Sequence, residues 1–158
     1  MKVIHVITDL DIGGAEMMLY KLLASLRNNE IESLVITLMG RGKITERIEA
    51  LGVKVETLDL EQGARPSWNT IKKLKRIVRI SNPDIIQGWM YHGNIAATLA
   101  IFLSYSMFRK VKLFWNVRQT LYDINSEKMQ TRWLVILGRW LSFFPHSIIY
   151  NSNLSAEQ

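Results

Sequence analysis

A short stretch near the middle of the chain gathers side chains that could bind a carbohydrate. Residues 88–94 read GWMYHGN and follow an apolar run that predicts a buried strand. The rings of Trp89 and Tyr91 could stack on a sugar or a base, and His92 and Asn94 could hydrogen-bond its hydroxyl groups. Two structural alternatives stay open, because Asn94 could cap the next helix and His92 could satisfy a nearby carbonyl. The position between strand and helix favours a binding role.

Two adjacent glycines, Gly13 and Gly14, separate an apolar segment from one with helical spacing. Backbone N–H groups at a helix start, with no side chain in front of them, can bind an anion such as a nucleotide diphosphate. The dinucleotide pattern G-x-G-x-x-G is absent, because Leu10, Ile12 and Ala15 interrupt it. The glycine pair therefore predicts an anion site, and a tight turn that needs positive φ is the alternative.

A later apolar run ends in Trp115, Asn116, Val117 and Arg118. The guanidinium of Arg118 is a planar fork that suits phosphate or carboxylate, although a surface ion pair would use it equally well. Asn116 joins the candidates for substrate binding.

Several other chemistries are excluded or disfavoured. The chain has no cysteine, so it has no disulfide framework, no cysteine-ligated metal and no thiol nucleophile. No cluster of His, Asp and Glu has the spacing of a metal site, and no G-x-S-x-G elbow is present. The segment GRGK at residues 40–43 lacks the spacing of a P-loop, and we interpret it as a flexible surface turn. What remains is a set of binding groups.

The net charge of +6 is unevenly distributed. Residues 1–60 hold 7 Lys/Arg against 9 Asp/Glu, whereas residues 61–158 hold 13 against 5. The later part should therefore attract anions. The basic residues between 72 and 79 spread around a predicted helix with an apolar face, which disfavours nucleic acid as a partner.

Two apolar segments could suggest a membrane. The run Ile95–Phe108 is about 14 residues long, too short to span a bilayer. A helical stripe in the last third is expected to be buried, with docking on a membrane surface as the alternative. Its members are Trp133, Leu134, Leu137, Trp140, Leu141 and Phe144.

Two kinds of apolar pattern alternate along the chain, one with strand and one with helical spacing. The predicted strands are Lys2–Thr8, Glu32–Leu38, Val53–Leu58, Asp84–Gly88, Val111–Val117 and Ser147–Tyr150. The predicted helices follow Gly14, span Ile44–Leu51, open at Pro66-Ser67, and run from about Asn94 to Phe108 and from about Glu127 to Phe144.

This alternation predicts an α/β fold, because each parallel neighbour in a sheet needs a crossover connection. We expect a Rossmann-like, doubly wound, mostly parallel sheet with helices on both faces, forming a single domain over residues 1–158. Ligands of such sheets bind beyond the carboxyl ends of the strands. The loops named by this rule are Asp9–Gly14, Gly88–Asn94, Val117–Asp123 and Asn151–Ser155.

Four segments together resemble the amino-terminal half of glycosyltransferase family 4: HVITDLDIGGAEMMLYKLL, PDIIQGWMYHGNIAATLA, LFWNVRQTLYD and RWLSFFPHSIIYNSNLSAEQ. The resemblance covers residues 1–158 and is most specific at Gly13–Glu16 and Trp89–Asn94. It implies one half of a GT-B fold, whose two Rossmann-like domains transfer a sugar from a nucleotide-diphosphate donor with retention of configuration. The donor half of the family carries a Glu-x7-Glu pair, and no two glutamates here stand eight apart. The donor-binding carboxy-terminal domain is therefore expected to be absent from this chain.

The resemblance also implies roles for individual residues. Gly13 and Gly14 would place amides near the donor diphosphate, and the acceptor side of the cleft would be lined by His92, Asn94 and Arg118, with Asn151 and Ser152 near the same cleft. Many members have H-x-H at Gln87–Trp89 and a histidine at Arg118, so no proton-transfer role is carried over. The catalytic candidates are His92 and Arg118, and the substrate-binding candidates are Gly13, Gly14, Trp89, Tyr91, Asn94, Asn116, Asn151 and Ser152.

The resulting expectation is the acceptor-side domain of a retaining glycosyltransferase of the hexosyltransferase type, inactive as an isolated fragment. Its acceptor would be a polysaccharide or glycolipid, and its partner the missing carboxy-terminal domain. No metal or other cofactor is expected, because amides and basic side chains would neutralise the departing diphosphate. The location would be cytoplasmic, with peripheral contact at the inner membrane face. The alternative is a stand-alone Rossmann-like module that binds a nucleotide or sugar without catalysis.

Overall fold

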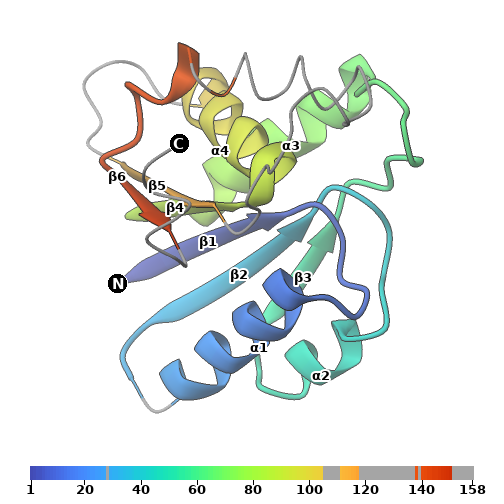
Figure 1. The fold of residues 1–158 in the computed structure, drawn as a ribbon, viewed down its shortest axis with the longest axis vertical. Coiled ribbons are helices and arrows are strands. Elements are labelled where there is room, and N and C mark those ends of the chain that lie inside the picture. The colour runs from blue at the N-terminus through green and yellow to red at the C-terminus, as the bar shows by residue number, and fades with distance from the viewer. Residues whose placement is uncertain (28, 105–110, 118–137, 139, 151–158) are drawn as a thin grey trace.

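A computed structural model of the chain shows a single six-stranded sheet in which every strand is parallel to its neighbours (Figure 1). The structure describes residues 1–27, 29–104, 111–117, 138 and 140–150. The strands are β1 (Lys2–Ile7), β2 (Glu32–Thr37), β3 (Lys54–Thr57), β4 (Ile85–Trp89), β5 (Lys112–Val117) and β6 (Ser147–Tyr150), and the helices are α1 (Gly14–Leu26), α2 (Thr45–Glu49), α3 (Trp68–Ser81) and α4 (Met90–Ser104).

Helices cover the sheet on both faces, which confirms the predicted architecture. The helices α1 and α2 lie on one face, and α3 and α4 lie on the other (Figure 1). Each face has its own apolar core, because neighbouring strand residues point to opposite sides. Ile7 and Val35 pack with α1 and α2, whereas Val6 and Ile36 pack with α3 and α4.

The strand order β3-β2-β1-β4-β5-β6 places β1 in the middle of the sheet. From β1 the chain moves outward to β3, returns through α3, and then moves outward in the other direction from β4. The order therefore reverses between β1 and β4, where Val6 pairs with Gly88. The two connections that leave this point go to opposite faces, and such a switch point is where doubly wound sheets bind ligands.

The predicted boundary before α4 is wrong. We expected a loop from Gly88 to Asn94, but β4 continues to Trp89 and α4 begins at Met90. The chain turns from strand to helix at Met90 alone, which has a φ of 63° in the left-handed region. This conformation is unusual for a residue with a side chain.

The last predicted helix, from about Glu127 to Phe144, lies largely outside the described residues. Within the described part of this segment, Gly138, Trp140 and Leu141 are helical. Trp140 is 74% exposed and Phe144 54% exposed, so the expectation that the stripe is buried is wrong for these two residues.

Candidate functional site

The starts of α1 and α4 flank the switch point. The helix α1 begins at Gly14, seven residues beyond the end of β1, and α4 begins directly after β4. Because β1 and β4 are adjacent and parallel, the two helix starts belong to the same edge of the sheet, one on each face. The end of β5 lies beside them, since Trp89 pairs with Asn116. We call this edge the carboxyl rim.

The first turn of α1 has the open backbone expected of an anion site. Gly13 is the N-cap, with an extended φ of −152° and no side-chain hydrogen bond, and Met17 N–H donates to its carbonyl at 3.1 Å. The N–H groups before Met17 precede the first helical hydrogen bond. A Cβ added to Gly14 would meet no atom within 4 Å. Since neither glycine has a positive φ, the tight-turn alternative is wrong for this pair.

A carboxylate lies against this helix start. The side chain of Glu16 folds back onto Gly13, where an added Cβ would collide with Oε2 of Glu16. The pKa of Glu16 is raised above its ordinary value, first by burial and then by the negative charges of Asp9 and Asp11. The position where we expected the diphosphate therefore holds the carboxylate of Glu16, and the carboxylates of Asp9 and Asp11 lie nearby.

The connection after β2 supports the loop that leads to Gly13. Ile44 N–H donates to the Leu10 carbonyl at 3.0 Å, and Gly42 N–H donates to Oγ1 of Thr45 at 2.9 Å. A Cβ on Gly42 would collide with the backbone of Leu10 and Asp11. The interpretation of residues 40–43 as a flexible surface turn is therefore wrong for Gly42, which packs tightly and fixes the loop ahead of α1.

Glycines also hold the start of α4 against the sheet. A Cβ on Gly93 would lie 2.5 Å from the Val6 carbonyl oxygen, and one on Gly88 would lie 2.5 Å from Cα of Asn94. Both distances are far inside van der Waals contact, so the helix and the strands approach each other through their backbones. This packing leaves no room for a side chain between β1 and the first turn of α4.

Trp89 belongs to the core. Its side chain is 1% exposed, packs with Ile7 and Leu19, and donates from Nε1 to Nδ1 of His5 at 3.3 Å. Burial lowers the pKa of His5 to about 4, against the smaller opposing effect of a hydrogen bond with Gln87. The expectation that Trp89 stacks on a sugar is corrected to a packing role. His5 was not singled out from the sequence, although a histidine within the apolar run KVIHVIT was a visible signal.

Asn94 and Asn116 link α4 to β5. Both are buried, and the Asn116 backbone N–H donates to Oδ1 of Asn94 at 3.3 Å. The Asn94 carbonyl accepts from Oγ1 of Thr98, which in turn accepts from Nε1 of Trp115. These contacts engage both Asn94 oxygens and help to position the rim, and the substrate contacts expected of Asn94 and Asn116 stay predictions.

Tyr91 and His92 remain accessible on the first turn of α4. Tyr91 is half-buried and His92 is exposed. Partial burial lowers the pKa of His92 below its ordinary value. The imidazole is therefore mainly neutral at pH 7, the form that can accept a hydrogen bond from a hydroxyl group.

Three candidates, Arg118, Asn151 and Ser152, lie outside the described residues. Arg118 directly follows Val117, the last residue of β5. Among the residues that the structure describes, no three His, Asp or Glu side chains gather where they could hold a metal ion.

A doubly wound parallel sheet with helices on both faces defines a Rossmann-like domain, and the open start of α1 and the imidazole of His92 lie at its switch point. The sequence model of Glycosyltransferase Family 4 matches residues 12–158. The chain therefore belongs to glycosyltransferase family 4. Comparison with curated protein sequences finds no significant match.

Solved structures show the same fold. HepE from Anabaena, in complex with UDP and glucose, matches with a TM-score of 0.74 at 19% identity, over 99% of this chain and 40% of its own. The apo form of the lipopolysaccharide outer core galactosyltransferase WaaB matches with a TM-score of 0.66 at 13% identity, over 99% and 41%. The chain thus spans about 40% of the length of these proteins and has the fold of one half of a GT-B glycosyltransferase.

Proposed function

We propose that this chain is the acceptor-side half of a retaining glycosyltransferase that moves a hexose from a nucleotide-diphosphate donor to a polysaccharide or glycolipid. The observation that carries the proposal is the meeting of the open start of α1 and the accessible His92 at one switch point. Membership of glycosyltransferase family 4 supplies the class of reaction. The other half of the cleft, which would bind the nucleotide and sugar, is proposed to lie outside this chain.

The two sides of the rim would have different tasks. Backbone N–H groups at Gly14 and Ala15 would hydrogen-bond the diphosphate and stabilise the negative charge that develops as the bond to the sugar breaks. Arg118, the residue after β5, would line the acceptor side of the cleft, as the resemblance to the family implies. The proposal requires no metal ion for this neutralisation. Glu16 must move off Gly13 when the diphosphate binds, because two anions cannot share that position.

His92 would position the acceptor. Its neutral imidazole can accept a hydrogen bond from the attacking hydroxyl group, and Tyr91 lies half-buried beside it in the first turn of α4. The short junction before α4 holds the backbone of His92 in a fixed position relative to β4.

The test is turnover by the full-length protein with a panel of UDP-, GDP- and dTDP-hexoses, followed by release of the nucleoside diphosphate. We expect His92→Ala to lower kcat/KM by roughly tenfold to a hundredfold, because a hydrogen bond to the reacting hydroxyl is lost. His146→Ala is the matched control, since His146 is exposed and precedes the amino end of β6. Residues 1–158 alone should bind acceptor without turnover.

Two results would contradict the proposal. If His92→Ala and His146→Ala were equally active, His92 would have no part in the reaction. If the full-length protein bound a nucleotide sugar saturably but never transferred the sugar, the stand-alone binding module would be the better description.

A further inference from the structure

A buried histidine lies beneath the carboxyl rim. His5 is in β1, one of the two strands that flank the switch point, and its side chain is 1% exposed. It pairs with Gln87 of β4, and Trp89 lies two residues farther along β4 on the same face of the sheet. The indole of Trp89 reaches back over this distance, and its Nε1 donates to Nδ1 of His5 at 3.3 Å. The two rings are inclined at 58° with centroids 6.1 Å apart, so a hydrogen bond rather than ring stacking joins them.

This hydrogen bond determines where the imidazole of His5 holds its proton. An indole has one N–H group and can only donate, so Nδ1 of His5 accepts and the ring proton is on Nε2. Burial lowers the pKa of His5 to about 4, so the ring is neutral at pH 7 and Nδ1 can accept. Nε2 is itself buried and has no hydrogen-bond partner of good geometry in the described part of the chain, although the side chain of Gln87 is near enough to act on the pKa of the ring. An apolar side chain would leave no polar atom unpaired at this place, so the property that histidine adds is the acceptor Nδ1.

Trp89 is the residue at which the sheet passes into α4. It ends β4, and Met90, with its φ of 63°, is the first residue of α4. The left-handed conformation of Met90 is unfavourable for a residue with a side chain and persists only where the surrounding contacts hold it. The indole of Trp89 packs with Ile7 of β1 and Leu19 of α1, and one peptide bond joins Trp89 to Met90. The orientation of this indole and the conformation of the junction therefore depend on each other, and His92 follows two residues later.

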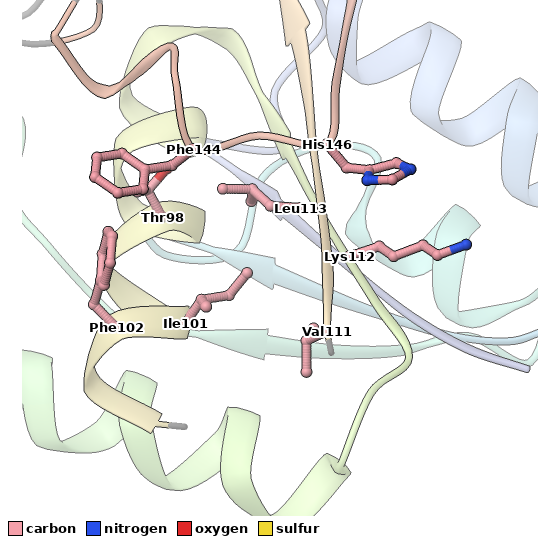
Figure 2. A pocket seen from close by; sticks show the side chains of 8 residues that line it. All are labelled: Thr98, Ile101, Phe102, Val111, Lys112, Leu113, Phe144 and His146. Carbon is pink, nitrogen blue, oxygen red and sulfur yellow. The ribbon is translucent and has the colours of Figure 1, made fainter. Parts of the chain in front are cut away.

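The two halves of α4 are held to different degrees. With 15 residues α4 is the longest described helix, and none of these helices is long and apolar enough to cross a membrane. Its second half borders a pocket of about 340 Å³, which is lined by Thr98, Ile101 and Phe102 of α4 and by residues around β5 and before β6 (Figure 2). At its first turn, by contrast, Gly93 has no room for a Cβ beside the Val6 carbonyl. The place of the first turn is therefore set mainly by contacts at its own end.

We propose that His5 is a positioning residue of the acceptor site, because by holding the indole of Trp89 it fixes the junction before α4 and thereby the place of His92. The inference rests on the proposed function, in which His92 accepts a hydrogen bond from the attacking hydroxyl group. His5 is buried and acts through Trp89 without contacting a substrate. Without the acceptor, the indole N–H would be an unpaired buried donor, and the ring would have to turn toward another partner. A displacement of about 1 Å at a reacting group can lower a rate about a hundredfold.

The experiment measures transfer by the full-length protein with the donor that the turnover panel identifies. His5→Leu removes the acceptor, and we expect kcat to fall by roughly fivefold to twentyfold, less than a full misplacement would cost. His5→Asn places an amide oxygen near the position of Nδ1, so it should recover most of the lost rate. The affinity for the nucleoside diphosphate should be the same in all three proteins, because the start of α1 is unchanged.

His5→Gln keeps the comparison informative if His5→Leu does not fold. Its amide oxygen lies one bond farther from the backbone, near the position of Nε2 instead of Nδ1. It should therefore be slow where His5→Asn is active, although both side chains are polar. Circular dichroism and the thermal midpoint report whether each variant is folded, and the exchange rate of the Trp89 indole proton, assigned with Trp89→Phe, should rise in His5→Leu and His5→Gln only.

Double variants show whether His5 acts through the two residues named. In the His92→Ala background, His5→Leu should have no further effect on kcat, because the group that it positions is gone. Trp89→Phe removes the indole N–H, so adding His5→Leu to it should change kcat little. The matched control is Ile48→Val, which alters a buried side chain of the same apolar core on α2. It should lower the thermal midpoint and leave kcat unchanged.

Three outcomes would overturn the inference. They are a parental kcat in His5→Leu, equal slowing in His5→Asn and His5→Leu, and a further loss when His5→Leu is added to His92→Ala. Full activity of His92→Ala would instead contradict the proposed function. A slow His92→Ala together with a fully active His5→Leu would retain the proposed function and remove this inference alone.

Discussion

The two helices that begin at the carboxyl rim use glycine in opposite ways. At α1, Gly14 has open space where a side chain would be, and the N-cap Gly13 makes no side-chain hydrogen bond. At α4, Gly88 and Gly93 are closed in by Asn94 and by the Val6 carbonyl. One helix start leaves room beside its backbone, and the other removes the space between helix and sheet. Glycines in a motif can therefore serve affinity or stability, and the two roles are separable by mutation.

The largest effect is expected from Gly93→Ala. Its Cβ would lie 2.5 Å from a backbone oxygen in the central strand, and neither α4 nor β1 has a loop that could yield. We expect a loss of about 3 kcal/mol in the free energy of unfolding, the upper end for overpacking in a core. Urea unfolding followed by circular dichroism measures it. An unchanged midpoint would show that the close approach of helix and strand is adaptable.

A second large effect concerns His5, the buried histidine of β1. The folded pKa of His5 is about 4 and the ordinary value is 6.5, so protonation favours the unfolded chain. Stability should be complete above pH 6.5 and fall by about 3 kcal/mol as the pH drops toward 4. Urea unfolding at several pH values measures the slope. His5→Leu should flatten the curve in this window, and a variant with the same slope as the parent protein would assign the pH dependence to other groups.

Gly14→Ala should separate affinity from stability. Alanine at an exposed first-turn position with room for its Cβ should stabilise the folded state by about 0.5–1 kcal/mol. By the proposed function the same methyl group would lie in front of the N–H groups, so the affinity for the nucleoside diphosphate that the turnover panel identifies should fall several-fold. Unfolding and isothermal titration calorimetry together test this pair of effects. If both stability and affinity fell, the start of α1 would be as closely packed as the start of α4, and the difference between the two helix starts would not hold.

The smallest effect is expected from Glu16→Gln. Removing the carboxylate from Gly13 should raise the affinity for that nucleoside diphosphate about threefold to fivefold, as expected for about 1 kcal/mol from one charge at an exposed helix start. Because the pKa of Glu16 is raised, the parent protein should approach the variant's affinity as the pH is lowered and the carboxylate is protonated. Glu46→Gln, in the first turn of α2, is the control. Lower affinity in Glu16→Gln would mean that Glu16 contacts the ligand directly.

The sequence predicted the fold because alternation and parallel pairing leave few topologies. All six described strands lie where the apolar runs place them, with ends shifted by a few residues. The sequence did not predict the short junction at Met90, because Gly88 and Gly93 look like loop residues until the partners that exclude a side chain are known.

The site was predicted only in part, because contacts between residues distant in sequence decide which side chains are accessible. Spacing placed Gly14 and His92 at one rim, and the strand order confirms that placement. Spacing could not tell that Trp89 points into the core while Tyr91 stays accessible, because it did not show that Trp89 ends β4 and that Tyr91 lies in the first turn of α4. Gly42 packs on Leu10, and this contact joins the loop after β2 to the loop after β1. The two loops are distant in sequence, so no local pattern indicated the contact.

The one-residue passage from β4 into α4 has a consequence for how such an enzyme would change its acceptor. Because no loop lies between strand and helix, the backbone of His92 is held in a fixed position relative to the sheet. If the proposed cleft closes over a bound sugar, the groups that line its other wall would have to move toward His92. Diversification among relatives would then fall on the segments around His92 while its own position is kept.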